Sequence, residues 1–478
     1  MKILLLDATI GTLKEGIKYI LFFCAVLLLR LPFLADGYGL DGDSWAVALS
    51  SLHWNVTGVY EASRFPGYPV HEFLCSQFVS DSFWVLNLLT ATFSSIGILF
   101  FVMGLRELRF RLPFLAGFAL ACIPVVFIHS TTVIDYSIAL AFELMAFYFM
   151  ARRWYWMVGV ALGMAIGTRI TSGALLIPFV ILVLDKDDLQ DNLWRILKVA
   201  LPAIVIGMIW YYPVYHRYGF DFLTYYDVPY PSIMRVFYKF FVEVWGVLGL
   251  VAVMLGVLFM FIPEIWWNQT YLFPRAVSVR EVVAWLVAID LYVIAFLKLP
   301  MESGYLLPII PFVILVLGKY LVRPAFIIVC GLFITSSFLF SVSPMDRPDA
   351  ETPSNISFGL KAGGERLILD VLKGPVISYK SRRENGMNYA HKIIAHTTDI
   401  KLPSVLICGQ WYNQVISINK DTVRGKVLFV SHVNEMELIH YFARGKQLYY
   451  LPMQAELNQQ VKGADPVVFG AKVFDPYQ

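Results

Sequence analysis

Acidic residues cluster in the first long polar stretch of the chain, where their carboxylates could do acid–base chemistry. Asp36, Asp41 and Asp43 lie in "LADGYGLDGDSW", and the interspersed glycines let the backbone bend. One positioned carboxylate can accept the proton of an attacking hydroxyl group, which typically accelerates a reaction by about 10²–10⁴. Two alternatives remain open. One is a solvated turn or calcium-like loop, although the spaced ligands ending in Glu are missing; the other is a divalent metal at Asp41 and Asp43, which is possible but not favoured.

Side chains that could hold a phosphate follow in the same stretch and beyond it. The segment "SRFPGYPVHEFL" offers Arg64, Tyr68 and His71 around a rigid Pro-Gly-Tyr-Pro turn. Asp135 lies where a later polar connection returns to an apolar run. Arg169 lies between two apolar runs, and a charge at membrane depth is costly enough to mark a functional candidate. Because a guanidinium can donate two parallel hydrogen bonds, Arg169 is suited to a phosphate.

A third polar group comes late in the apolar part of the chain. The segment "KLPMESGYLLPIIPF" places Lys298, Glu302 and Tyr305 at the ends of two adjacent apolar runs. Each has an ordinary explanation by itself, as a snorkelling cation, a helix cap or an aromatic interface anchor. Because all three are expected on the same side of the membrane as the acids, the sequence predicts that they share one site.

The elements that must position these residues are membrane-spanning helices. Of the 478 residues, 58% are hydrophobic and 15% are charged, whereas soluble domains have about 25% charged residues. Runs of about 20 apolar residues can each cross a bilayer. The sequence therefore predicts a polytopic α-helical membrane protein and excludes a disordered, fibrous or ordinary cytosolic chain. Eleven spans are predicted, although 155–184 could form one broken hairpin: 18–35, 83–104, 112–128, 138–151, 155–168, 171–184, 196–212, 241–262, 281–297, 305–320 and 325–342.

The charges of the connections predict how the chain is oriented. Basic residues occur on alternate connections, which places the N-terminus in the cytoplasm, and the acids occur on the opposite ones. With an odd number of spans, the C-terminal tail lies outside the cytoplasm. The net charge of +3 gives no global basic field, so a nucleic-acid partner is not expected. Membrane lipids are the expected surroundings.

From about residue 343 the chain mixes polar and apolar residues and has no further run long enough to span a membrane. The sequence predicts a transmembrane catalytic domain over 1–342, with its outer loop at 36–82, and a small soluble extracytoplasmic α/β domain over 343–478. Short β-branched runs predict strands of a mostly parallel sheet. The predicted strands are Val376–Tyr379, Val405–Cys408, Val427–Val430 and Gln447–Leu451, with a helix at Glu435–Arg444.

The order and sidedness of these pieces resemble the GT-C glycosyltransferases. These membrane enzymes use lipid-phosphate sugars and include protein O-mannosyltransferases and aminoarabinose transferases. The resemblance covers roughly residues 15–345 and is carried by "DGDSW", "RFPGYPVHEFL", a second outer Asp and "PMESGYLLPIIP". This chain departs from many relatives at Ser44, where they have Glu, and at Gly304, where they have Arg.

The resemblance implies roles for individual residues. Asp43 matches the catalytic acid of the first outer loop, with Asp41 as its close competitor, and Asp135 matches the second outer acid. Arg169 and Lys298 would neutralise a donor phosphate. Glu302 and Tyr305 match the late motif.

We therefore expect a glycosyltransferase that moves a sugar from a polyprenyl-phosphate carrier to a hydroxyl acceptor on a protein, lipid or glycan. A single displacement would invert the anomeric centre, since retention would need a second, nucleophilic carboxylate. No cofactor is expected. The alternative is a transporter or flippase of lipid-linked sugars, which would carry charges along a path through several spans. A bacterial inner membrane is favoured over the endoplasmic reticulum.

Overall fold

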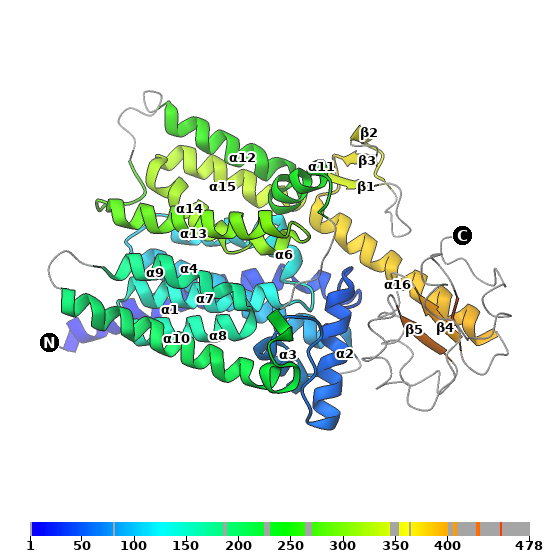
Figure 1. Cartoon of the computed structure of the whole chain (residues 1–478). Coiled ribbons are helices and arrows are strands. Elements are labelled where there is room, and N and C mark those ends of the chain that lie inside the picture. Colours follow the sequence, from blue (N-terminus) through cyan, green and yellow to red (C-terminus); the bar gives the residue numbers. More distant parts are fainter. Residues whose placement is uncertain are drawn as a thin grey trace.

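The chain folds into a bundle of long helices that lie side by side (Figure 1). The computed structural model describes residues 2–79, 82–184, 189–223, 230–262, 270–344, 353–362, 365–399, 405–408, 427–430 and 450–451. The main helices of the bundle are α1 (Lys2–Leu28), α4 (Phe83–Glu107), α5 (Pro113–Cys122), α7 (Asp135–Ala151), α8 (Tyr155–Thr168), α9 (Leu176–Val183), α10 (Leu189–Tyr218), α12 (Val244–Phe261), α13 (Val279–Lys298), α14 (Ile309–Tyr320) and α15 (Arg323–Ser336).

Short helical segments connect the main helices. They are the 3₁₀ segments η1 (Leu31–Phe33), η2 (Ile170–Leu175), η3 (Asp221–Leu223) and η6 (Ser303–Leu306), the helices α3 (Pro69–Gln77), α6 (Pro124–His129) and α11 (Ile233–Phe237), and the π-helical segment η4 (Tyr238–Glu243). Helix α2 (Gly42–Thr57) runs across one end of the bundle (Figure 1). We call this end the α2 end. The chain starts at the opposite end.

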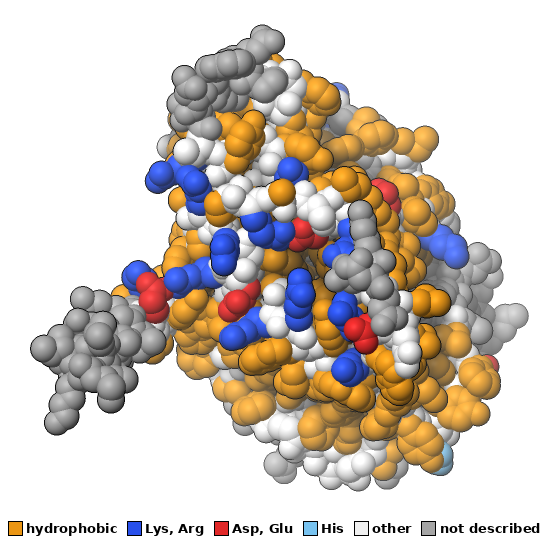
Figure 2. Space-filling model, turned by 90° about the vertical axis from the view of Figure 1, so that its left-hand side faces the viewer, with side chains coloured by type: hydrophobic (Ala, Val, Ile, Leu, Met, Phe, Trp, Pro, Cys, Tyr) orange, Lys and Arg blue, Asp and Glu red, His pale blue; other side chains and the backbone are white. Residues whose placement is uncertain are grey.

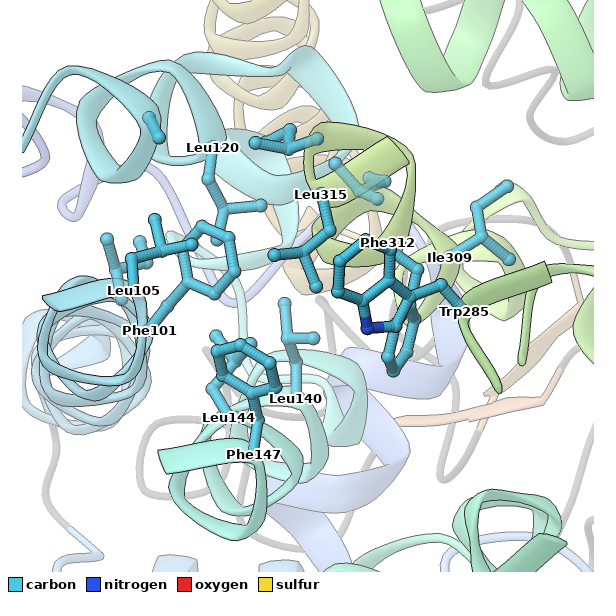
Figure 3. Close-up of a cluster of buried hydrophobic side chains, with 14 of the residues drawn as sticks. Phe101, Leu105, Leu120, Leu140, Leu144, Phe147, Trp285, Ile309, Phe312 and Leu315 are labelled. Carbon is cyan, nitrogen blue, oxygen red and sulfur yellow. The ribbon is translucent and has the colours of Figure 1, made fainter. Parts of the chain in front are cut away.

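Large apolar side chains fill the centre of the bundle. Figure 3 shows Phe101 and Leu105 of α4, Leu120 of α5, Leu140, Leu144 and Phe147 of α7, Trp285 of α13, and Ile309, Phe312 and Leu315 of α14 packed together. Helices far apart in the sequence therefore share one core, and the close van der Waals packing of these side chains favours association of the helices in a bilayer.

Helices of the bundle coincide with each of the eleven predicted spans. Among the described residues, four stretches are long and apolar enough to cross a membrane: Glu15–Phe33, Phe83–Glu107, Leu189–Tyr218 and Ile233–Phe261. Helices α10 and α12 expose large apolar side chains such as Met208 and Phe261, as expected for surfaces in contact with lipid. The protein is an integral membrane protein, and the number of its spans stays a prediction.

Helix α2 lies within the predicted outer loop 36–82. Asp41 is its N-cap, and the side chain accepts a hydrogen bond from the backbone N–H of Asp43 at 3.3 Å, which satisfies one of the free donors of the first turn. Gly58 ends the helix in the left-handed conformation, which glycine adopts without strain. Trp45 and Val47 are buried against the bundle, so this face of α2 fixes the acids at its N-terminus.

The polar tail begins with a sheet that the sequence analysis missed. Strands β1 (Ser341–Pro344), β3 (Glu365–Asp370) and β2 (Ser357–Ala362) pair antiparallel in that order. The predicted strand Val376–Tyr379 is wrong, because these residues form the start of helix α16 (Pro375–Asp399). Its β-branched residues indicated a strand locally, but Pro375 suits the first turn of a helix, and contacts with the outer loop described below fix the helix.

The parallel part of the tail agrees with the sequence prediction. Strands β5 (Val427–Val430), β4 (Val405–Cys408) and β6 (Tyr450–Leu451) form a parallel sheet in that order. The first two match predicted strands, and β6 falls within the predicted strand Gln447–Leu451. The predicted helix Glu435–Arg444 lies outside the described residues.

Candidate functional site

Arg64 joins the acids of two different loops at the α2 end. Its Nε lies 2.9 Å from Oδ2 of Asp43, and its Nη2 donates to Oδ1 of Asp135 at 2.7 Å. The other carboxylate oxygen of Asp135 accepts from Arg169. Four of the predicted site residues therefore form one continuous chain of ion pairs, Asp43–Arg64–Asp135–Arg169, that brings together residues from four places in the sequence.

Local backbone geometry explains where Asp135 and Arg169 lie. Asp135 is the first residue of α7, where the free backbone N–H groups and the helix dipole favour an acid. Arg169 follows the end of α8 in an extended conformation, before η2 begins. Both side chains are buried, with 0% of Asp135 and 7% of Arg169 exposed. A buried charge is stable when it is paired, so each residue depends on the other.

Aromatic rings surround the two guanidinium groups. The centre of the Arg64 guanidinium lies 4.1 Å from the ring centroid of Tyr68. The corresponding distances from Arg169 are 4.0 Å to Tyr136 and 5.1 Å to Tyr305. Tyrosine faces attract a cation more strongly where water is excluded. The rings therefore help to fix both cations. Tyr68 and Tyr305 are predicted site residues, but the sequence analysis missed Tyr136.

A second cluster of polar side chains lies beside this chain of ion pairs. Nζ of Lys239 is 3.8 Å from Oε1 of Glu302 and donates to the backbone carbonyl of Met301. Burial and the neighbouring Asp43 carboxylate raise the pKa of Asp41 to about 6. Burial and the neighbouring Asp41 carboxylate also raise the pKa of Glu302. Glu302 and Asp41 thus affect each other's charge, which places the late motif next to the first acidic loop.

Two predicted residues have other surroundings. The His71 side chain is fully buried, and Nε2 lies 3.5 Å from Sγ of Cys75. Burial lowers the pKa of His71 to about 4, so the ring is neutral near pH 7 and adds no charge to a phosphate site. Lys298 is exposed at the end of α13. No contact found among the described residues joins it to Glu302 or Asp135. The cation that lies beside Glu302 is Lys239 instead.

Glu72 organises the turn that presents Arg64. Its carboxylate accepts from the Tyr60 hydroxyl at 2.6 Å, the Ser63 backbone N–H at 2.7 Å and the Tyr68 backbone N–H at 3.1 Å. These bonds fix the backbone on both sides of Arg64. The role of Glu72 is therefore to position the turn.

One donor of the Arg64 guanidinium has no partner. Its Nη1 is buried and makes no hydrogen bond to any described residue, and a buried donor without a partner is costly. An anionic oxygen of a ligand would satisfy it. Lys239, which the sequence analysis also missed, adds a further buried cation nearby. Its only signal in the sequence is a Lys at the start of a predicted span.

Positive charge gathers at the other end of the bundle. Figure 2 views the end at which the chain starts, and Lys and Arg side chains predominate there over acids. They include the exposed Arg109 and Arg111 between α4 and α5, and Arg152 and Arg153 between α7 and α8. The acids of the candidate site and this basic surface therefore lie at opposite ends.

Comparison with known proteins identifies the fold. No protein-family model and no curated sequence matches the chain. Among solved structures, ArnT from Cupriavidus metallidurans bound to undecaprenyl phosphate matches with a TM-score of 0.55 and 14% identity, over 90% of this chain and 89% of that one. The apo structure of that protein matches with a TM-score of 0.54 and 14% identity, over 91% and 90% of the two chains. At this identity the likeness concerns the fold. At the level of the fold the chain matches ArnT, in agreement with its sequence resemblance to the GT-C glycosyltransferases.

Proposed function

We propose that this protein transfers a sugar from a polyprenyl-phosphate carrier to a hydroxyl acceptor on the extracytoplasmic side of a membrane. The observation that carries the proposal is the chain of ion pairs through Arg64, whose buried Nη1 lacks a partner among the described residues. A donor phosphate would supply the missing acceptor oxygen. The solved structure of ArnT with undecaprenyl phosphate supports this class of donor.

The reaction needs one base and fixed cations. The acceptor hydroxyl attacks the anomeric carbon, its proton passes to the Asp43 carboxylate, and the bond from that carbon to the phosphate oxygen breaks. Polyprenyl phosphate leaves with the electron pair. Arg64, Arg169 and Lys239 would stabilise the negative charge that develops on the phosphate. Because the mechanism has one displacement, it inverts the anomeric centre.

Asp43 is the preferred base because its carboxylate is the most open of the acids in the ion-pair chain. Its side chain is 39% exposed, whereas that of Asp135 is 0% exposed. Asp41 is the alternative base. Among the described residues, no group of three metal-binding side chains includes Asp41 or Asp43. The proposal assigns no metal, and metal dependence stays open to a direct test.

Charge distribution supports the sidedness of the proposal. Basic loops of membrane proteins stay in the cytoplasm, and the basic surface in Figure 2 lies opposite to the candidate site. The site would then face outwards, in a bacterial inner membrane by preference. The same distribution argues against a flippase, since the acids and cations of the site gather at one end.

A transfer assay with full-length protein in vesicles tests the function. The probe is a polyprenyl-phosphate sugar labelled in the sugar, with a membrane extract as the source of acceptors. We expect wild-type protein to move label from the lipid to an acceptor and to release polyprenyl phosphate. Asp43→Asn should slow this by about 10²–10⁴ without loss of folded protein. A flippase would move the donor across the vesicle without consuming it.

Two further variants test the residue roles. If the double variant Asp41→Asn, Asp43→Asn turned over normally, the assignment of the base would be wrong. Arg169→Ala should raise the donor concentration needed for half-maximal rate, because a cation facing the phosphate is lost. An unchanged donor titration would reject the phosphate role of Arg169.

A further inference from the structure

Residues 34–40, which lead into the acidic motif, contain neither helix nor strand. Their backbone carbonyls and N–H groups therefore need partners from elsewhere, because unpaired polar groups are costly when buried. Asn87 of α4 provides some of them: its side-chain amide donates to the carbonyls of Leu34 and Gly37, each at 2.8 Å. Trp45 and Val133 donate to the carbonyls of Gly39 and Tyr38. Further partners come from α16, more than three hundred residues later in the chain.

Arg383 of α16 inserts into this segment. Its side chain is 2% exposed, and its guanidinium donates to the carbonyls of Phe33 at 2.9 Å, Asp36 at 3.0 Å and Gly37. Its Nη1 also donates to the carbonyl of Thr131 at 3.1 Å, in the loop that leads to Asp135. One planar group with five donors thus connects the loops that carry the acids of the candidate site.

Two further residues on the same face of α16 also contact residues 38–45. The Tyr379 hydroxyl accepts a hydrogen bond from the backbone N–H of Leu40 at 3.0 Å. Met387 packs against the apolar cluster of Tyr38 and Trp45. Tyr379, Arg383 and Met387 are spaced four residues apart, so they form one stripe along the helix. Leu40 immediately precedes Asp41, the N-cap of α2.

We propose that α16 is a positioning element of the active site, in which Tyr379 and Arg383 hold residues 33–40 so that Asp41 and Asp43 face Arg64. The polar tail is then part of the catalytic apparatus rather than an independent appendage. This inference rests on the proposed function for its effect on rate. That Tyr379 and Arg383 hold residues 33–40 in place is a separate physical claim. A displacement of about 1 Å at a reacting group can cost about 10²-fold in rate.

The first measurement needs no activity. Hydrogen exchange of full-length protein in detergent reports how firmly residues 34–44 are held. Arg383→Lys keeps the charge but loses the planar fork, and Tyr379→Phe keeps the ring but loses the acceptor. We expect faster exchange over 34–44 in both variants. The control Lys380→Gln, on the same helix, removes the pair with Glu384 and a charge that acts on Asp36 at longer range, but no hydrogen bond to residues 34–44. Its exchange should stay close to that of wild type. Unchanged exchange in both test variants would overturn the proposal.

The second measurement separates positioning from a general loss of folding. We expect Arg383→Lys to lower turnover at saturating donor by at least tenfold and Tyr379→Phe by about fivefold, with less than a twofold change in donor affinity. Among the described residues, no hydrogen bond or ion pair joins Arg64, Arg169 or Lys239 to α16, which is why donor binding should survive. Equal losses of turnover and donor binding would indicate a merely structural helix and contradict the proposal. If wild-type protein consumes no donor, the proposed function fails. The exchange result still decides whether α16 holds residues 33–40 in place.

Discussion

Arg64 and Asp43 form an ion pair with an N–O distance of 2.9 Å, although the same guanidinium also holds Asp135. A ligand phosphate that approaches Arg64 therefore competes with Asp43 for its positive charge. In the proposed reaction, donor binding and the freedom of the Asp43 carboxylate to accept a proton are linked through one side chain, which makes Arg64 the most informative residue to change.

Arg64→Lys should lower kcat/KM for transfer by about 10- to 100-fold, because an ammonium group cannot hold two acids in a planar fork and about 1 Å of displacement costs about 10²-fold. Steady-state transfer assays at several donor concentrations measure this. The control is Arg217→Lys, whose partner Glu61 belongs to the same outer loop. That Arg is 38% exposed, and exposed pairs contribute about 0–1 kcal/mol. Equal behaviour of the two variants would refute a special role for Arg64.

The pH dependence of turnover should show an acidic limb near pH 6. Burial and the Asp43 carboxylate raise the pKa of Asp41 to about 6. If the site requires ionised Asp41, the rate falls as the pH drops through this value and is about tenfold lower one unit below it. Because the folded state binds this proton more tightly than the unfolded chain, protonation of Asp41 stabilises the fold. Lost rate at pH 5 is then not explained by unfolding through this group.

Asp41→Asn tests that assignment. Asparagine is also a good N-cap, so α2 keeps its start while the titrating group is lost. We expect a lower rate with no limb near pH 6. A profile with the wild-type limb would show that another group titrates there.

The sequence predicted the helical fold and the gathering of these acids at one end of the bundle, because both depend on patterns that recur along the chain. Apolar runs indicate helices, and the alternation of basic and acidic connections places Asp43, Asp135 and Glu302 at one end. Which side chains pair is a different matter. The link from Arg64 to both acids depends on the packing of α7 against the outer loop, and no spacing in the sequence encodes it.

In the tail, too, long-range contacts that the sequence pattern does not encode decide the structure. Val376–Tyr379 has a strand-like composition, yet it is helical because Tyr379 and Arg383 make contacts on one face of α16 with residues 33–40. Such long-range contacts override local propensity. The two parallel strands β4 and β5 were predictable because each is a short, continuous apolar run with β-branched residues.

Lys239 and Lys298 offer a matched pair of variants. Lys298 is closer to Glu302 in sequence, but its side chain is exposed, whereas Lys239 is 8% exposed and lies 3.8 Å from Glu302. Lys239→Ala should weaken donor use, since it removes a buried cation and leaves Glu302 beside Asp41 without compensation. Because the Glu302 side chain is 34% exposed, the cost falls below the about 3–5 kcal/mol expected for a fully buried pair. Donor titrations should show a large effect for Lys239→Ala and little for Lys298→Ala. The reverse order would favour the role that the sequence resemblance assigns to Lys298.

Gly304 leaves room for the ring that supports Arg169. A Cβ atom at this position would lie 2.7 Å from two ring atoms of Tyr136, and Tyr136 lies 4.0 Å beneath the Arg169 guanidinium. Overpacking of this kind costs about 1–3 kcal/mol. If the ring moves to relieve it, Arg169 moves too, and Gly304→Ala should lower kcat/KM by about 5- to 150-fold, mainly through weaker donor use. The control is Gly331→Ala in α15, where an added Cβ has nothing within 4 Å and activity should stay near that of wild type. Normal donor use by Gly304→Ala would mean that the ring of Tyr136 adjusts without disturbing Arg169, and the aromatic support would then be dispensable.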